Sequence, residues 1–235
     1  MRHVSFSAVL ALCFCLLGNS CSKGITRETA ATVFFTKGNV VFGNAERNNF
    51  QPVTSKSKIR AGDTVRTSDD GSISLALMPG AFVQLFGDSE IRIQDLRLTK
   101  DGNETAGGVL DRLASIRLNR GRIVSLFSRG DTGASQFNVT TSQVTLSPDS
   151  DCLFSLWTDG KTTRVTCGRG EVTASADTQP PEKIAVGNFY QWPTASKAPN
   201  AATADASAQI DIKTALDAEA ELLDQAAGWQ NRPVF

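Results

Sequence analysis

Short runs in which apolar and polar residues alternate occupy most of the chain. Ile73, Leu75 and Leu77 form one such run, and Ile91 with Ile93 forms another. Successive side chains of a β-strand point to opposite faces, so this period of two is typical of a strand with one buried face. Further runs of this kind are Val83 with Leu85, Ile116 with Leu118, Phe137 with Val139, and Phe154 with Leu156. The pattern predicts many short strands.

Turn-forming residues separate these runs. Asp69-Asp70-Gly71, Pro79-Gly80, Asp101-Gly102 and Asp159-Gly160 each combine residue types that favour tight turns. Many short strands at such spacing are characteristic of a sandwich or a barrel. We therefore expect an all-β domain over residues 31–192, built as a multi-stranded antiparallel sandwich or a barrel-like sheet.

The C-terminal part of the chain has a different composition. Residues 193–207 are rich in Ala, Thr and Ser and show no core pattern, so we expect a linker there. Residues 208–230 are dominated by Ala, Leu, Glu and Gln, and Leu216, Leu223 and Ala227 recur at spacings of seven and four. This pattern predicts an α-helix. Such a helix packs either on its own domain or on a second subunit.

The N-terminus is typical of an export signal. Arg2 gives residues 1–20 a positive start, and Val4–Leu17 is an uncharged, mostly apolar run that is short for a membrane span. Cys21 comes directly after the small residue Ser20, which resembles a bacterial lipobox, where the thiol is acylated and anchors the protein. An uncleaved anchor and simple secretion are the alternatives. We therefore expect a lipid-anchored envelope protein that faces the periplasm. Ser22 stands where aspartate is associated with inner-membrane retention in some bacteria, so the outer membrane is favoured.

Charge and histidine content narrow the classes of function. The 235-residue chain has 24 basic and 24 acidic side chains, so we expect no nucleic-acid partner. Its single histidine, His3, lies in the signal region. The mature protein therefore lacks imidazole for general-base, nucleophile or metal-ligand roles. We expect a protein that is not an enzyme, with no catalytic residue, cofactor or metal. A hydrolase that acts through paired carboxylates is the alternative.

Two cysteines flank a predicted hairpin. If Asp159-Gly160 forms a two-residue turn, Phe154 faces Val165 and Cys152 faces Cys167. Opposed Cα atoms in a hairpin lie about 4.5 to 5.5 Å apart, which suits a disulfide, and the envelope is oxidising. We therefore predict a structural disulfide between Cys152 and Cys167. The alternatives are two buried reduced thiols, or a turn of another length that changes the register.

A locally basic stretch suggests a contact surface. Arg117, Arg120 and Arg122 lie close together in the sequence, and Arg117 alternates with apolar residues, so its side chain is expected to point away from the core. These three arginines are the candidate surface for an acidic partner or an anionic polymer. The alternative is a solvated strand face with no partner.

Several motifs resemble one known family. Residues 59–67 read IRAGDTVRT and are followed by the alternating strands up to Ile93, and Gly170-Glu171-Val172 appears later. This arrangement resembles the FecR domain of bacterial envelope signalling proteins, over about residues 37–175. The resemblance implies a β-sheet scaffold in which Gly62 and Asp63 shape a turn before the next strand.

The resemblance also implies a regulatory role. Proteins of this family lie in the periplasm and relay the iron-siderophore state of an outer-membrane receptor to a sigma factor, through a transmembrane helix and a cytoplasmic segment. In this chain, the lipobox-like signal occupies the N-terminus instead. We therefore expect a non-catalytic envelope protein that binds a protein partner or an envelope polymer. The alternative is a sensory or regulatory component of a trans-envelope signalling or uptake system.

Overall fold

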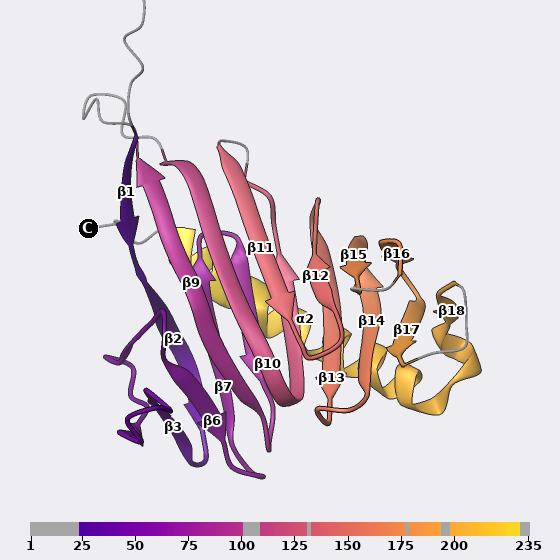
Figure 1. The fold of residues 1–235 in the computed structure, drawn as a ribbon, viewed down its shortest axis with the longest axis horizontal. Coiled ribbons are helices and arrows are strands. Elements are labelled where there is room, and N and C mark those ends of the chain that lie inside the picture. The colour runs from indigo at the N-terminus through magenta and orange to yellow at the C-terminus, as the bar shows by residue number, and fades with distance from the viewer. Residues whose placement is uncertain (1–23, 101–108, 131–132, 177–178, 194–197, 231–235) are drawn as a thin grey trace, which may run out of the picture.

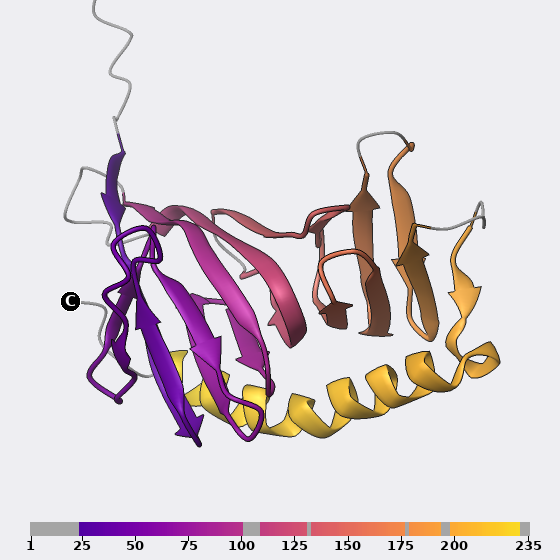
Figure 2. The same ribbon diagram turned by 60° about the horizontal axis from the view of Figure 1, so that its bottom comes forward.

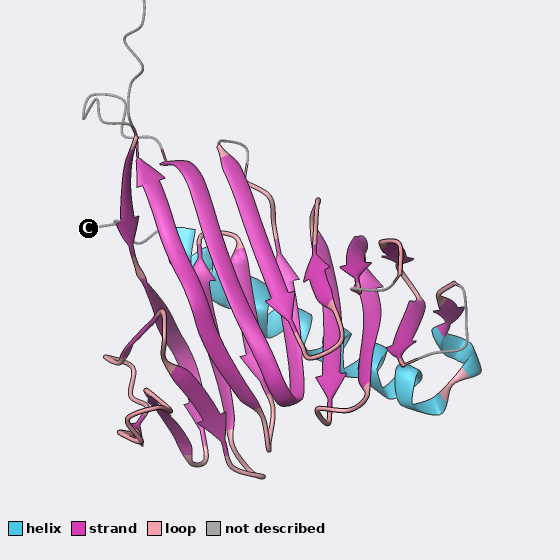
Figure 3. Ribbon diagram, in the orientation of Figure 1, coloured by secondary structure: helices cyan, strands magenta, loops and turns pink. Residues whose placement is uncertain are grey.

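The computed structural model describes residues 24–100, 109–130, 133–176, 179–193 and 198–230. Most of these residues lie in β-strands, and one long helix follows near the C-terminus (Figures 1 and 3). The prediction of an all-β domain with a C-terminal helix is confirmed. The expected signal at residues 1–20 and the expected lipidation site at Cys21 lie outside the described residues.

One sheet, called sheet A here, has β9 and β10 near its centre. In order across the sheet, its strands are β4 (Gln51–Pro52), β3 (Val40–Gly43), β6 (Thr64–Thr67), β9 (Glu90–Lys100), the first part of β10 (Val109–Phe127), β11 (Ala134–Thr140), β12 (Thr145–Ser147), β15 (Glu171–Ser175) and β16 (Glu182–Ala185). β1 (Ile25–Glu28) pairs with the end of β9. The sheet is mixed, because β10 and β11 run parallel.

The other sheet, called sheet B here, is antiparallel throughout its described pairs. In order across the sheet, its strands are β5 (Lys58–Arg60), β2 (Ala30–Lys37), β7 (Ser72–Met78), β8 (Ala81–Leu85), the last part of β10, β13 (Cys152–Thr158), β14 (Thr163–Arg169), β17 (Asn188–Trp192) and β18 (Asn200–Ala201). Traced through these pairs, neither sheet returns to its starting strand. The two sheets are therefore open and form a sandwich.

Strand β10 belongs to both sheets. Its residues up to Arg120 pair with β9 in sheet A, whereas those from Gly121 onwards pair with β13 in sheet B. Gly121 lies at this crossing with a φ of +91°, in the left-handed region where glycine has no Cβ penalty. The positions that face the core between the sheets change there from the even-numbered Ile116 and Leu118 to the odd-numbered Ile123 and Phe127. Each sheet thus turns its apolar side toward the other.

The main core fills the space between the two sheets. Sheet A contributes Val65, Ile91 and Ile93, and sheet B contributes Leu75 and Val83; all of these side chains are fully buried. They occupy the positions that the alternating pattern marks as core-facing. The period of two in the sequence therefore reflects a strand face that is packed against the opposite sheet.

A helix covers the outer face of sheet B. Helix α2 (Ala206–Gln230) follows a short 3₁₀ turn, η1 (Ala202–Ala204), and lies along the sheet as a third layer (Figure 2). The Asp205 side chain accepts a hydrogen bond from the backbone N–H of Ala208 at 2.8 Å, which satisfies a free donor of the first helical turn. The helix packs on its own domain, the first of the two arrangements considered from the sequence.

The buried side of α2 differs from the apolar stripe seen in the sequence. Ala215, Ala218 and Leu222 pack on sheet B, whereas Leu216 and Leu223 remain 47% and 44% exposed. Small side chains on the buried side allow the helix axis to come close to the strands. Leu222 is the one large side chain among these three buried residues, whereas Leu216 and Leu223 face away from the sheet.

Substitution at the strand crossing tests its steric basis. Gly121→Ala would place a Cβ 2.5 Å from the Cα of Ser89, so strain at positive φ and overpacking should together lower the free energy of unfolding by about 3 kcal/mol. Gly62→Ala is the matched control, since Gly62 has a φ of +92° and no atom within 4 Å of an added Cβ; it should cost about 1 kcal/mol. Urea unfolding measures both. Equal losses would contradict the steric account.

Candidate functional site

The hairpin of β13 and β14 has a register different from the predicted one. Leu156 pairs with Val165, and Phe154 pairs with Cys167. The turn spans the four residues 159–162, since Thr158 pairs with Thr163. It is stabilised by the Asp159 carboxylate, which accepts hydrogen bonds from the backbone N–H groups of Lys161 and Thr162. The prediction of a two-residue turn is therefore wrong, and the register is shifted by two residues.

The shifted register separates the two cysteines along the hairpin. Cys152 pairs with Phe127 on β10 instead of with Cys167, and both thiols are free in the structure. Burial raises the pKa of the Cys167 thiol to about 11, and burial together with the nearby Cys167 raises the pKa of Cys152 further. The reactive species of cysteine is the thiolate, so neither thiol is a nucleophile at neutral pH.

Thiol alkylation distinguishes the free thiols from the predicted disulfide. In the chain from residue 22 onwards, Cys152 and Cys167 are the only cysteines. Because both are buried and protonated, native protein purified without reductant should not react with iodoacetamide at pH 8, and protein unfolded in urea should take up two labels. Mass spectrometry counts the labels. No label in urea until a reductant is added would show the disulfide instead.

The buried carboxylate of Asp211 on α2 pairs with two arginines of sheet B. The Nε of Arg164 on β14 donates a hydrogen bond of 2.6 Å to Asp211 Oδ2, and a terminal nitrogen of Arg122 on β10 lies 2.8 Å from Oδ1. The Asp211 side chain is 1% exposed. The Arg164 guanidinium also lies 5.3 Å from the ring centre of Trp157. Arg122, one of the three candidate contact residues, is thus engaged under the helix.

Removing this carboxylate should loosen the helix. Asp211→Ala leaves two guanidinium groups facing each other under α2, and breaking a buried ion pair costs about 3 kcal/mol or more. Asp217→Ala, the control, removes an exposed pair with Lys213 on the same helix and should cost about 0.5 kcal/mol or less. Urea unfolding measures both variants. Similar small losses for the two would mean that the buried pair does not hold the helix.

The outer face of sheet A carries the other two candidate arginines. Arg117 and Arg120 on β10 are exposed, and Arg117 lies directly opposite Arg92 on β9. A shallow hollow of about 280 Å³ lies here, lined by Gly62, Arg92, Ile93, Gln94 and Arg117. The cluster Arg117, Arg120 and Arg122 is therefore divided between the two outer faces of the sandwich.

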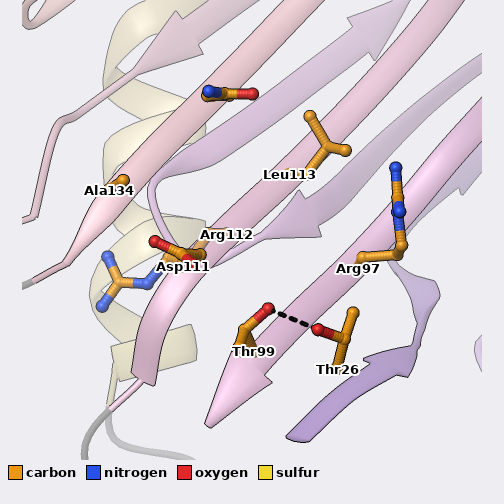
Figure 4. A pocket seen from close by; sticks show the side chains of 8 residues that line it. Thr26, Arg97, Thr99, Asp111, Arg112, Leu113 and Ala134 are labelled. Atoms are coloured by element: carbon orange, nitrogen blue, oxygen red, sulfur yellow. Dashed lines mark hydrogen bonds between the residues drawn. The ribbon is translucent and has the colours of Figure 1, made fainter. Parts of the chain in front are cut away.

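A second hollow lies farther along the same face. It measures about 290 Å³, and the residues that line it are Thr26, Arg97, Thr99, Asp111, Arg112, Leu113, Ala134 and Gln136 (Figure 4). The hydroxyls of Thr26 and Thr99 are joined by a hydrogen bond of 2.9 Å. Asp111 is the single carboxylate in this lining, whereas glycoside hydrolysis requires a pair. In the described residues, no group of three or more potential metal ligands is found.

Arg92 and Gln94 line this face but carry no motif that marks them in the sequence. Their exposure could have been found, because both alternate with buried Ile91 and Ile93 on β9. Their position beside Arg117 could not, since it follows from the pairing of β9 with β10. A bulge between Ser115 and Ile116 shifts that register by one residue, which the hydrophobic pattern does not reveal.

The sequence matches a known family in the part of the chain that contains both sheets' central strands. Residues 63–173 match the family model described as FecR protein. This chain contains a FecR domain. The match runs from β6 to β15 and includes β10 and the hairpin of β13 and β14. The resemblance found from the motifs is confirmed, and FecR-domain proteins are associated with the cell envelope.

Two solved structures show a weaker likeness to the FecR-domain chain. Both are crystal structures of a candidate anti-sigma factor from Parabacteroides distasonis ATCC 8503, at 2.50 and 1.65 Å resolution, with 12% and 14% sequence identity and TM-scores of 0.40. The alignments cover 55% of this chain and 53% of those chains, so the chain spans about half of their length. No protein with a curated description matches in sequence. Within the described residues, no helix has the length and apolar character needed to cross a membrane.

Proposed function

We propose that this FecR-domain chain is a non-catalytic regulatory component of the cell envelope that binds a protein partner on the outer face of sheet A. One observation carries the proposal: α2 covers the outer face of sheet B (Figure 2), whereas sheet A presents exposed arginines and two hollows on its outer face. The FecR domain supports a regulatory role. An envelope polymer is the other candidate partner.

The polar character of this face supports a reversible contact. The outward residues of β9, β10 and β11 include Arg92, Gln94, Arg117, Gln136 and Asn138. Interfaces between regulatory proteins are commonly about as polar as the rest of the surface, and charged groups there speed association and choose the partner. A face of this kind suits a partner that associates reversibly.

Photo-crosslinking tests which face binds the partner. A photoreactive amino acid in place of Gln136 on sheet A should crosslink to a partner protein in intact envelopes, because this side chain is exposed on the proposed face. The same residue in place of Lys213, which is exposed on α2, is the control. Products are identified by mass spectrometry. A partner captured from position 213 and not from position 136 would refute the proposed face.

We also propose that Cys21 is acylated and holds the chain at the envelope membrane. Two or more acyl chains bind a bilayer firmly, whereas one chain alone binds marginally. Cys21→Ser should therefore move the protein from the membrane fraction to the soluble fraction and abolish labelling by a palmitate analogue. Retention of label, or membrane binding without it, would favour an uncleaved anchor.

A further inference from the structure

Two like charges face each other on the outer side of sheet A. Arg92 and Arg117 are direct cross-strand partners on β9 and β10, and like charges in this position destabilise a sheet. Arg92 pairs at 3.1 Å with Glu46, whose side chain is 73% exposed. In the described part of the chain, the Arg117 guanidinium has no ion pair or hydrogen bond. The pair therefore retains a net positive charge.

One further side chain that can donate hydrogen bonds, Gln94, lines the hollow beside these arginines. The Gln94 side-chain oxygen accepts hydrogen bonds from the hydroxyls of Ser115 and Thr140, each at 3.1 Å. The NH₂ group of Gln94 therefore points away from these two hydroxyls, and it can only donate hydrogen bonds. Gly62 leaves the space above it open, because no atom lies within 4 Å of its missing Cβ position. The hollow is thus lined by two guanidinium groups and an amide.

The size and charge pattern of the hollow favour a discrete carboxylate. Its volume of about 280 Å³ lies below the usual range for small-molecule sites, so it suits one side chain. Arginine binds carboxylates through two parallel hydrogen bonds. Glu90 and Glu46 lie nearby, bound to Arg66 and Arg92, and their charges would repel a continuous polyanion passing over the face.

We propose that this hollow is an anion site that binds a glutamate or aspartate side chain from an acidic segment of the partner protein. The inference rests on the proposed function and specifies the chemistry of the contact. Arg117 supplies the free guanidinium, and Arg92 exchanges its exposed pair with Glu46 for the incoming carboxylate. Gln94 donates the third contact and fixes the orientation of the carboxylate.

The experiment titrates the mature chain with a dye-labelled peptide of alternating Glu and Gly residues and measures fluorescence anisotropy. Saturable binding should weaken about tenfold in Arg117→Gln, since a charged hydrogen bond contributes about 1.5 kcal/mol or more. Arg169→Gln is the matched control, because Arg169 is also exposed but lies on β14 of sheet B, where it already pairs with Glu219 of α2. It should bind within about twofold of the parent protein. A Gln-Gly peptide should not bind.

Three results would overturn the anion site. The first is no saturable binding of the Glu-Gly peptide. The second is an equal loss in Arg169→Gln, which would indicate general charge attraction. The third is tighter binding of an alginate oligomer that also depends on Arg117, which would identify an anionic polymer as the occupant. If one of these results is found while photo-crosslinks from position 136 are still formed, the proposed function stands and the anion site alone falls.

Discussion

The structure depends on one strand that is shared by two sheets. β10 pairs with β9 and β11 in sheet A and then with β8 and β13 in sheet B. The crossing requires a residue without a side chain where β10 passes Ser89, and Gly121 meets this requirement. Ser89 also stabilises the crossing, because its hydroxyl accepts a hydrogen bond of 2.9 Å from the backbone N–H of Arg122. The two layers are therefore covalently continuous as well as packed.

The second constraint is that sheet B has apolar side chains on both faces, so both faces must be buried. Its inner side faces sheet A, and its outer side bears Phe82, Val124 and Leu126, which α2 buries. This interface also contains polar groups, among them the buried Ser155 and Thr166 hydroxyls and the Asp211 carboxylate with its two arginines. Of these groups, the Asp211 carboxylate links α2 to β10 and β14 through Arg122 and Arg164. The helix thus leaves sheet A as the face available to a partner.

Much of the fold followed from the sequence, and the failures have physical causes. Alternation located the core positions of β7 and β9, because each strand has one face toward the opposite sheet. The hairpin register was wrong because the Asp159 carboxylate stabilises a four-residue turn. Arg117 and Arg122 were grouped together because they are close in sequence. Between them β10 changes sheets, and their side chains lie on opposite outer faces.

The central claim is that the sandwich keeps Arg122 and Arg164 under α2 while Arg117 and Arg120 stay open on sheet A. Arginine footprinting with phenylglyoxal, read by mass spectrometry of the native mature chain, tests it most directly. We expect rapid modification of Arg117 and Arg120, with Arg122 and Arg164 protected until the protein unfolds. Modification of Arg122 as fast as Arg117 would contradict it, because α2 would then not hold sheet B.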